Sequence, residues 1–269
     1  MIYLFSICLG LILGSFFNVL IWRIPREESI LWPPSHCPSC GNAIKPWENI
    51  PVISFLFLRG KCSNCKKNIS WVYPFIELMT AICSFIICFF LFKQDISNLS
   101  WFSFPPLILQ YLFLLLMLPV AVIDIKHYII PDRFTLPLIV CGFLISFLPG
   151  DITPIQSLAG ILLGGGTLYL IGWIGTAILK KGDAMGFGDV KLMAATGAIF
   201  GAKISLMSIV FGAFFGSVIG LTLIACKKLD PDHHIPFGPF LGAGIWLSIM
   251  AGDLILKTYC TYIENITSF

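Results

Sequence analysis

The sequence predicts an all-α polytopic membrane protein, and its composition is the first reason. Residues of the set AVILMFWYC fill 57% of the 269 positions, and only 12% of the residues are charged. An ordinary globular chain carries about twice that charged fraction. The mean hydropathy is +0.91, so the chain holds more apolar surface than one core can hide from water. Most of these side chains must therefore face lipid.

Long apolar runs are the second reason. A helix that spans a bilayer needs about 20 mostly apolar residues, because backbone amides in hydrocarbon must bond within their own segment. The first run, Ile2 to Trp22, lacks the basic start and cleavage site of a removable signal peptide, so we expect it to stay as a span. A weaker run, Val190 to Phe200, is short unless it borrows flanking residues. The other runs are Val72 to Phe92, Phe104 to Ile123, Phe134 to Leu148, Ile155 to Leu179, Ile204 to Ala225 and Ile235 to Leu256.

The distribution of basic residues predicts the orientation of about eight spans. Of the 17 Lys and Arg residues, only Lys93, Lys203 and Lys257 fall on one side. The richer side is predicted to be cytosolic, which places the N-terminus outside. If Val190 to Phe200 dips in and out of the bilayer, the split between the two sides is unchanged, so charge leaves this segment open. The net charge of +3 is too small to indicate nucleic acid as a partner.

The loop between the first two spans is the largest segment predicted outside the bilayer. We therefore expect a first transmembrane helix over residues 1–22, a cytosolic lobe over residues 23–71, and a membrane-embedded domain over residues 72–269. The lobe holds two CxxC pairs, and a reducing compartment disfavours disulfides between them. Paired thiolates at such spacing suit one tetrahedral zinc ion in a closed structural site. The ligands would be Cys37, Cys40, Cys62 and Cys65.

The lobe leaves two details open. The four cysteines can instead be reduced thiols in a loop, and His36 can compete as a ligand, although four cysteines already complete the site. Gly41 and Asn64 suit the tight turns of such zinc-binding knuckles. Zinc here would hold together a lobe that is too small to build its own core, and it would carry out no chemistry.

Two aspartates are predicted at the cytosolic ends of spans, where an ionisable group indicates a function. Asp124 ends the third span, and Asp189 begins the short run at Val190. Two neighbouring carboxylates share one proton, so one can activate a water while the other donates to a carbonyl. Gly186 and Gly188 leave the backbone bare beside Asp189, which allows an extended peptide to approach. The alternative is two unrelated aspartates that cap helices or pair with neighbouring lysines, Lys126 and Lys191.

Two further acids lie within spans and have simpler interpretations. Glu77, one turn into the second span, favours a structural hydrogen bond to a neighbouring helix. Asp253 lies near the outer end of the last span, where we expect it to be solvated.

An ordered set of motifs resembles one family along essentially the whole chain. GFGD at 186–189, followed by VKLMAA, with Asp124 ahead of IPD at 130–132, closely resembles the prepilin peptidases, the type IV leader peptidases of the GxGD aspartic class. Similar signatures occur in the same order as in that family. They are GSFFNVLIWRIP at 14–25, the two CxxC pairs, ENIPVISFLFLRGKC at 48–62, YPFIELMTA at 73–81 and IPFGPFLGAG at 235–244.

The resemblance implies a bifunctional enzyme of the bacterial cytoplasmic membrane. Such enzymes remove the basic leader of type IV prepilins or secretion-system pseudopilins after a glycine on the cytosolic side. They then N-methylate the new first residue, with S-adenosylmethionine as the donor. Asp124 and Asp189 would be the protease dyad, and Gly60 and Lys61 would belong to the methylating half. The family pattern also places the IPFGP loop in the cytosol, which favours eight spans.

Methyl transfer rests on this resemblance alone, since no strand leads into a glycine-rich nucleotide-binding turn. A peptidase without methyl transfer is therefore one alternative. A channel or transporter is another, but its acids should lie near the midplane of internally repeated halves, and the chain shows neither feature. A membrane scaffold whose zinc lobe binds a partner would leave the two aspartates without a role.

Overall fold

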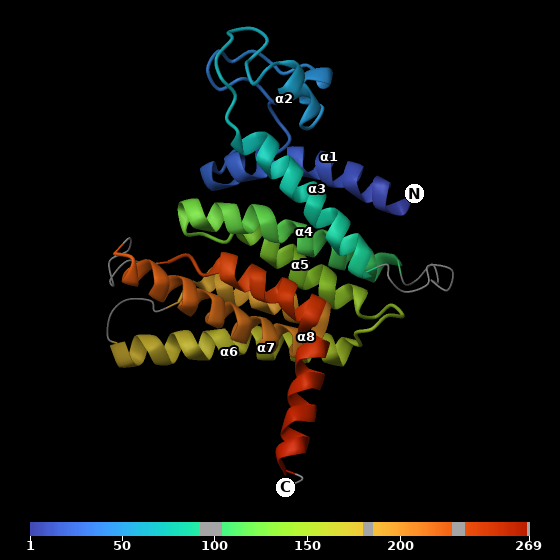
Figure 1. The fold of residues 1–269 in the computed structure, drawn as a ribbon, viewed down its shortest axis with the longest axis vertical. Helices are drawn as coiled ribbons and strands as arrows, with labels where there is room; N and C mark the ends of the chain where they lie inside the picture. The colour runs from blue at the N-terminus through green and yellow to red at the C-terminus, as the bar shows by residue number, and fades with distance from the viewer. Residues whose placement is uncertain (92–103, 180–184, 228–234, 268–269) are drawn as a thin grey trace. The chain divides into compact units, whose positions relative to one another are not determined.

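The computed structural model describes residues 1–91, 104–179, 185–227 and 235–267, and every regular element within them is helical. Figure 1 shows these helices in chain order. They form two compact units, residues 1–98 with 114–119, and residues 99–113 with 120–269. The helices are α1 (Ile2–Arg23), α2 (Ile53–Phe57), α3 (Val72–Leu91), α4 (Phe104–His127), α5 (Asp132–Ile145), α6 (Pro154–Leu179), α7 (Phe187–Ala225) and α8 (Gly238–Thr267), with two short 3-10 helices at Ile24–Arg26 and Pro46–Asn49.

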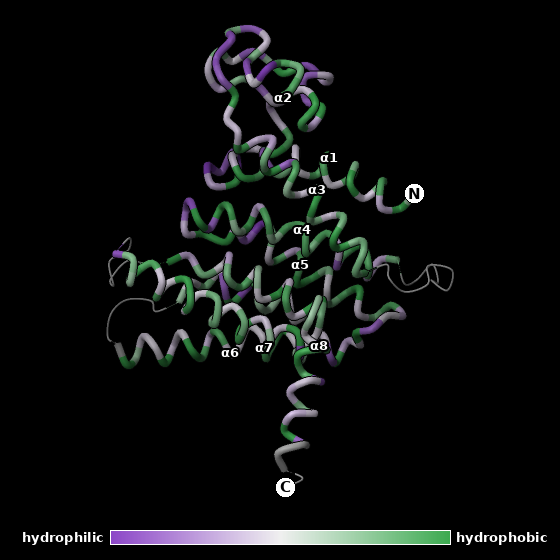
Figure 2. The backbone as a smooth tube through the Cα atoms, in the orientation of Figure 1, coloured by the Kyte–Doolittle hydropathy of each residue, from purple (hydrophilic) through white to green (hydrophobic). Residues whose placement is uncertain are grey.

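Six of the described helices are long and apolar enough to cross a membrane, which confirms the polytopic fold class. These helices are α1, α3, α4, α6, α7 and α8. Figure 2 shows them as mostly hydrophobic tubes. The remaining predicted span, Phe134 to Leu148, corresponds to α5, whose 14 residues measure about 21 Å, against the roughly 30 Å of bilayer hydrocarbon. The count of eight spans is therefore not confirmed.

The α7 segment folds back on itself at Gly201. This glycine has φ +79° and ψ 175°, a conformation outside the helical region. The Ser205 hydroxyl donates to the Met193 carbonyl at 3.0 Å, whereas residues this far apart in a straight helix are separated by about 18 Å. The run Val190 to Phe200 is thus a separate segment, antiparallel to the rest of α7. Whether it crosses the bilayer stays a prediction.

Small residues let the helices of the second unit approach closely. Gly160 of α6 lies directly against Gly197 of α7, so that a Cβ on either would collide with the backbone of the other. The Ser157 hydroxyl donates to the Ala198 carbonyl at 2.8 Å beside this contact. On the other side of α7, a Cβ at Gly244 of α8 would lie 2.8 Å from the Gly212 nitrogen. This small-residue packing is typical of membrane helices, and it fixes α7 between α6 and α8.

The α1 and α3 helices of the first unit pack in the same way. A Cβ at Gly14 would lie 2.6 Å from the Cα of Glu77. Nearer the lobe, the Asn18 amide donates to the Tyr73 carbonyl at 3.1 Å. Because residue numbers rise along α1 as they fall along α3, the two helices are antiparallel, and the ends that lead into the lobe lie together.

Candidate active site

Asp124 lies in the last turn of α4 and is 5% exposed. Its Oδ2 accepts a hydrogen bond of 2.8 Å from the backbone N–H of Gly238, the first residue of α8. A Cβ on residue 238 would lie 2.7 Å from the same oxygen, so glycine is needed for this approach. The N-terminus of a helix carries a partial positive charge, which stabilises a carboxylate placed there. α8 thereby fixes one carboxylate at the end of α4.

Asp189 lies in the first turn of α7 and is 8% exposed. The Asp189 N–H donates to the Gly186 carbonyl at 3.1 Å. A Cβ on Gly186 would lie 3.1 Å from the Asp189 Oδ2. A Cβ on Gly188 would lie 2.9 Å from the Cβ of Ile130. Both glycines therefore make room for groups of the chain itself, the Asp189 carboxylate and Ile130. The approach of an extended peptide to this backbone stays a prediction.

The structure brings these two carboxylates to one end of the second unit. Ile130 contacts the backbone beside both aspartates. It packs against Gly188, which precedes Asp189, and its Cδ1 lies 3.2 Å from where a Cβ on Gly238, the partner of Asp124, would be. Neither aspartate forms a salt bridge with any residue in the described part of the chain. The pair is thus buried, close together and free of a described counter-ion.

Lys191 pairs with Asp132 and not with Asp189. Its Nζ lies 2.7 Å from both carboxylate oxygens of Asp132, the first residue of α5, and 4.9 Å from the centre of the Phe187 ring. This geometry disfavours the alternative in which the nearest lysine neutralises Asp189. Sequence reasoning missed Asp132 as a partner, although it ends the IPD motif. The ion pair joins the start of α5 to the turn of α7 that carries Asp189.

The four lobe cysteines lie together in the first unit. Their Sγ atoms are all within 4.8 Å of one another, and those of Cys37 and Cys65 are 3.9 Å apart. Zinc bonds thiolates at about 2.3 Å in a tetrahedron, which places the sulfurs about 3.8 Å apart. None of the ten cysteines of the chain forms a disulfide. The four thiols therefore suit one zinc ion, with side-chain shifts of no more than about 1 Å.

Two matching turns hold these thiols. The Cys37 N–H donates to the Asn42 carbonyl at 2.9 Å, and the Cys62 N–H donates to the Lys67 carbonyl at the same distance. In each turn the residue after the second cysteine has positive φ, 69° at Gly41 and 60° at Lys66. The prediction for Gly41 is confirmed. The prediction for Asn64 is also confirmed, because Asn64 lies within the second turn, where its amide donates to the Cys40 sulfur at 3.8 Å.

Backbone amides lower the pKa values of some of these thiols, which favours the ionised form that binds metals. The Ser39 amide lowers the pKa of Cys37, and the Asn42 amide lowers that of Cys40. The Lys67 amide lowers the pKa of Cys65, but desolvation and the three neighbouring thiols outweigh it and raise that pKa to about 11. Four thiols in one cluster cannot all ionise easily without a cation between them. The cluster therefore suits a divalent ion that displaces their protons.

Gly60 has a structural explanation, and Lys61 is exposed. Gly60 has φ +66°, and a Cβ there would lie 3.1 Å from the Phe55 ring. Its carbonyl accepts the Ile69 N–H at 2.7 Å. Phe55 therefore covers this bare backbone, and a role of Gly60 and Lys61 toward a methyl donor stays a prediction.

The remaining predicted acids have described partners. Glu77 accepts the backbone N–H of Val52 at 2.7 Å, and the Ser15 hydroxyl of the neighbouring helix α1 interacts with the same carboxylate. The predicted hydrogen bond to a neighbouring helix is therefore confirmed, with the addition of a second one to the lobe. Asp253 is 76% exposed and pairs with Lys203 at 2.6 Å. Solvation of Asp253 is therefore confirmed, with the addition of a surface ion pair.

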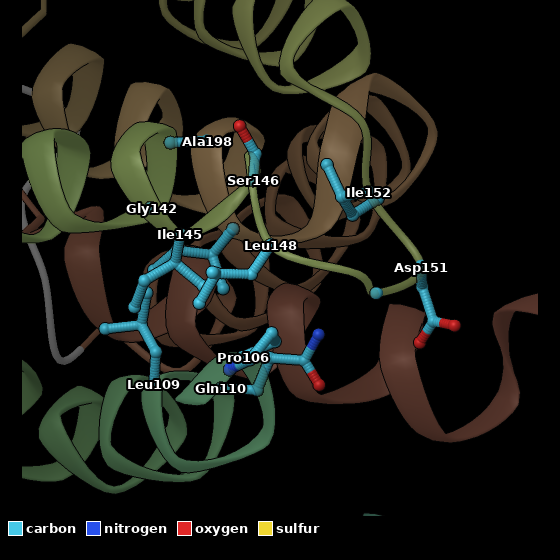
Figure 3. Close-up of a pocket in the computed structure, with 12 residues that line it drawn as sticks. Pro106, Leu109, Gln110, Gly142, Ile145, Ser146, Leu148, Asp151, Ile152 and Ala198 are labelled. Atoms are coloured by element: carbon cyan, nitrogen blue, oxygen red, sulfur yellow. The ribbon is translucent and has the colours of Figure 1, made fainter. Parts of the chain in front are cut away.

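Figure 3 shows a pocket beside the beginning of α4. It is lined by the first turns of α4, the end of α5 and the segment that leads to α6, with Gln110, Ser146 and Asp151 among its polar residues. Its lining residue Pro106 and Asp124 are separated along α4 by about 27 Å at 1.5 Å per residue. The pocket is therefore not part of the carboxylate site.

In this multi-pass helical membrane protein, two buried carboxylates from separate helices lie close together. That arrangement is the one expected of an intramembrane aspartic peptidase. Comparison with known proteins agrees with this class. Residues 8–91 match the bacterial peptidase A24 N-terminal domain, and residues 111–221 match the type IV leader peptidase family. The chain belongs to the type IV leader peptidase family.

Three relatives, each named prepilin leader peptidase/N-methyltransferase, show how far the similarity extends. The Pseudomonas aeruginosa protein is 32% identical, over 96% of this chain and 93% of its own length. The Bacillus subtilis protein is 36% identical, over 93% of this chain and 94% of its own. The Neisseria gonorrhoeae protein is 33% identical, over 93% of this chain and 90% of its own. No solved structure matches the chain.

Proposed function

We propose that this enzyme removes the basic leader of type IV prepilins or type II secretion pseudopilins, after a glycine at the cytosolic face, with Asp124 and Asp189 as the catalytic pair. The observation that carries the proposal is that two buried carboxylates, distant in sequence, meet at one end of the second unit. The printed names of the relatives support the substrate class.

The proposed mechanism divides the proton transfers between the two aspartates. Because two carboxylates at close range do not readily ionise together, the pair holds one proton. The ionised member takes a proton from a water as that water attacks the scissile carbonyl, and the protonated member donates to the carbonyl oxygen. The resulting tetrahedral intermediate then collapses: the C–N bond breaks, the leaving nitrogen takes the proton held by the first aspartate, and the second aspartate takes its proton back as the C=O bond re-forms. The Gly238 amide and the Asp132–Lys191 ion pair hold the supporting helix ends in place.

We also propose that the enzyme methylates the amine exposed by cleavage, with S-adenosylmethionine as the donor. The names of the relatives support this half, because they include N-methyltransferase. The lobe, residues 23–71, would serve methylation, while residues 72–269 would form the peptidase domain and residues 1–22 the first span. Gly60 and Lys61 remain proposed for this half from the resemblance alone.

The orientation is proposed from charge and from the resemblance. The lobe and the two aspartates would lie on the cytosolic side of a bacterial inner membrane, with the N-terminus outside. About eight segments would then cross, with α5 and the first segment of α7 as short ones.

Incubation of the purified protein with a prepilin tests the proposal. Loss of the leader is expected, detected by the shift in mass of the pilin, followed by the mass of one methyl group when S-adenosylmethionine is present. A transporter or a scaffold would leave the prepilin intact. A peptidase alone would cut without adding the methyl group.

We predict that the lobe binds one zinc ion per chain through Cys37, Cys40, Cys62 and Cys65. Metal analysis of the purified protein should give a stoichiometry near one, and the four Cys→Ser replacements should each lower it. A stoichiometry near zero in the unaltered protein, with four freely alkylated thiols, would show that the cluster is a set of reduced cysteines.

Removal of the zinc should separate the two activities. Cleavage should survive a chelator in the short term, because the proposed nucleophile is a water held by carboxylates and not by a metal. Methylation should decline, because the lobe loses the ion that holds its two turns together. The measurement is a parallel time course of leader loss and methyl incorporation after chelation. Immediate loss of cleavage, restored by zinc, would indicate a metalloprotease.

A further inference from the structure

The lobe exposes an apolar surface on its one α-helix among the described residues. On α2, the side chains of Leu56 and Phe57 are 64% and 85% exposed, and Ile53 is exposed beside them. We call these three residues the α2 face. Figure 2 shows the hydrophobic colour of α2 within a lobe that is otherwise largely hydrophilic. Large apolar side chains grouped in this way on a polar lobe indicate a surface that something covers.

A hydrogen bond places this helix at the depth of the membrane spans. Val52, which immediately precedes α2, donates its N–H at 2.7 Å to Glu77, a buried residue of α3. Glu77 lies five residues after the start of α3 at Val72, which corresponds to about 7.5 Å along the helix axis. Because the Glu77 side chain leans toward the N-terminus of α3, the start of α2 lies beside the first two turns of a membrane span.

An aromatic contact fixes the opposite side of α2. Phe55, the buried residue of α2, packs edge-on against Trp71 with 4.7 Å between ring centres. Trp71 directly precedes α3, where a tryptophan suits the boundary between headgroups and hydrocarbon. With Phe55 turned toward this contact, Leu56 and Phe57 are left on the outside.

The backbone at Val52 is strained in order to hold this position. Val52 has φ 61° and ψ −48°, and the Ile53 N–H donates to the Pro51 carbonyl at 2.6 Å. This is a γ-turn with positive φ, a rare and strained turn for a β-branched residue. Such strain persists only where surrounding contacts over-determine it, and here the buried Glu77 carboxylate supplies the contact. The placement of α2 is therefore built into the fold.

The charges beside the α2 face suit the cytosolic leaflet. Arg59 and Lys61 follow α2 directly, and both are exposed. Basic residues next to apolar side chains attract anionic headgroups while the apolar side chains enter the boundary below them, typically to about 5–10 Å. That depth agrees with the position of the start of α2 along α3. Depth, apolarity and charge thus favour one occupant, the lipid bilayer.

We propose that α2 is an interfacial anchor, whose Ile53, Leu56 and Phe57 insert into the cytosolic leaflet beside α3. The lobe is then held by lipid as well as by its two flanking spans, which keeps it against the membrane surface where a substrate with a membrane-embedded segment would present its cut end. The anchor depends on the membrane topology and not on either proposed activity, so its failure and theirs are distinguishable.

Site-specific photocrosslinking tests the anchor in the full-length protein. Benzoylphenylalanine in place of Phe57 keeps an aromatic side chain, and the variant is reconstituted in vesicles of phosphatidylethanolamine and phosphatidylglycerol. Irradiation should give lipid adducts detectable by mass spectrometry. The matched control carries the same group at Asn42, which is exposed at the first cysteine turn. The lipid adduct yield should be several-fold higher at position 57 than at position 42.

Each other outcome overturns the proposal. Absence of lipid adducts at position 57, or equal yields at the two positions, would place the α2 face in water. Crosslinks from position 57 to a second copy of the chain, in place of lipid, would make the face a protein interface. Zinc content measured on both variants confirms that the lobe is folded during the comparison.

Discussion

Asp124→Asn and Asp189→Asn should each abolish leader cleavage while the protein remains folded and inserted. Asparagine keeps the volume of the side chain, but it does not take up a proton from water near neutral pH. Loss of one general acid or base slows catalysis by about 10²–10⁴-fold, and the structure offers neither aspartate a described substitute. The measurement is the rate of leader loss from a prepilin, at matched amounts of membrane-inserted enzyme.

The geometry makes these substitutions a test of chemistry and not of packing. At position 124 the amide oxygen of asparagine can still accept the Gly238 N–H that Asp124 Oδ2 accepts at 2.8 Å. A helix cap would also tolerate the change, since Asp and Asn cap about equally well. Thermal stability should therefore fall little while cleavage is lost. The double variant should be no slower than either single one, because each carboxylate performs its own half of the proton transfer.

Asp253→Asn is the matched control. Its carboxylate pairs with Lys203 in an exposed ion pair, which contributes little to stability because solvent screens it, and cleavage should proceed at the normal rate. If Asp124→Asn or Asp189→Asn still processed prepilin at a near-normal rate, the assignment of that residue would be wrong. Glu77, the other buried carboxylate of the membrane helices, would then be the next to replace.

The two carboxylates were predictable because they interrupt apolar runs, where any charge stands out. Their partners were not predictable. Gly238 is 114 positions from Asp124, and only the packing of α8 brings its amide to that oxygen. The partner of Lys191 was equally hidden, since Asp189 lies two positions away in the sequence, whereas the actual partner, Asp132, is 59 positions away. Hydropathy locates helices, but it does not fix which helix ends meet.

The backbone turns were the other limit of sequence reasoning. A break after the apolar run that ends at Phe200 was predictable, because Gly201 and Lys203 separate it from the run at Ile204. The backbone conformation of Gly201 that makes the reversal was not. Val52 is harder still, because a β-branched residue disfavours positive φ, and its strain becomes intelligible only with the Glu77 contact in view. The cysteine lobe was predicted in more detail, because a metal site constrains residue type and spacing locally.

Gly160→Ala should destabilise the second unit severely. Gly160 of α6 and Gly197 of α7 touch backbone to backbone, so one added methyl group has no flexible side chain to displace and must push the helices apart. Overpacking of a close contact typically lowers the free energy of unfolding by about 1–3 kcal/mol, and a rigid backbone contact belongs at or beyond the upper end. We expect a large fall in the thermal midpoint, measured by size-exclusion recovery after heating in detergent.

The consequence for activity follows from the position of this contact. The same segment of α7 carries Asp189 in its first turn, so separation of α6 and α7 shifts one carboxylate relative to the other. Because a displacement of about 1 Å can reduce catalysis by 10²-fold, cleavage should fall even at temperatures where the variant stays folded. Gly197→Ala should behave alike, and the double variant should lose less than the sum of the two, since both methyl groups act on one contact.

Gly166→Ala supplies the control for this last prediction. It makes the same substitution in the same helix, α6, but a Cβ there meets nothing within 4 Å. Alanine is favoured over glycine within a helix by about 0.5–1 kcal/mol, so stability should be unchanged or slightly higher and cleavage normal. Equal loss in the Gly160 and Gly166 variants would mean that α6 tolerates no side chain at all. Equal tolerance would mean that the α6–α7 contact at Gly160 is looser than the structure shows, and that Asp189 depends on another support.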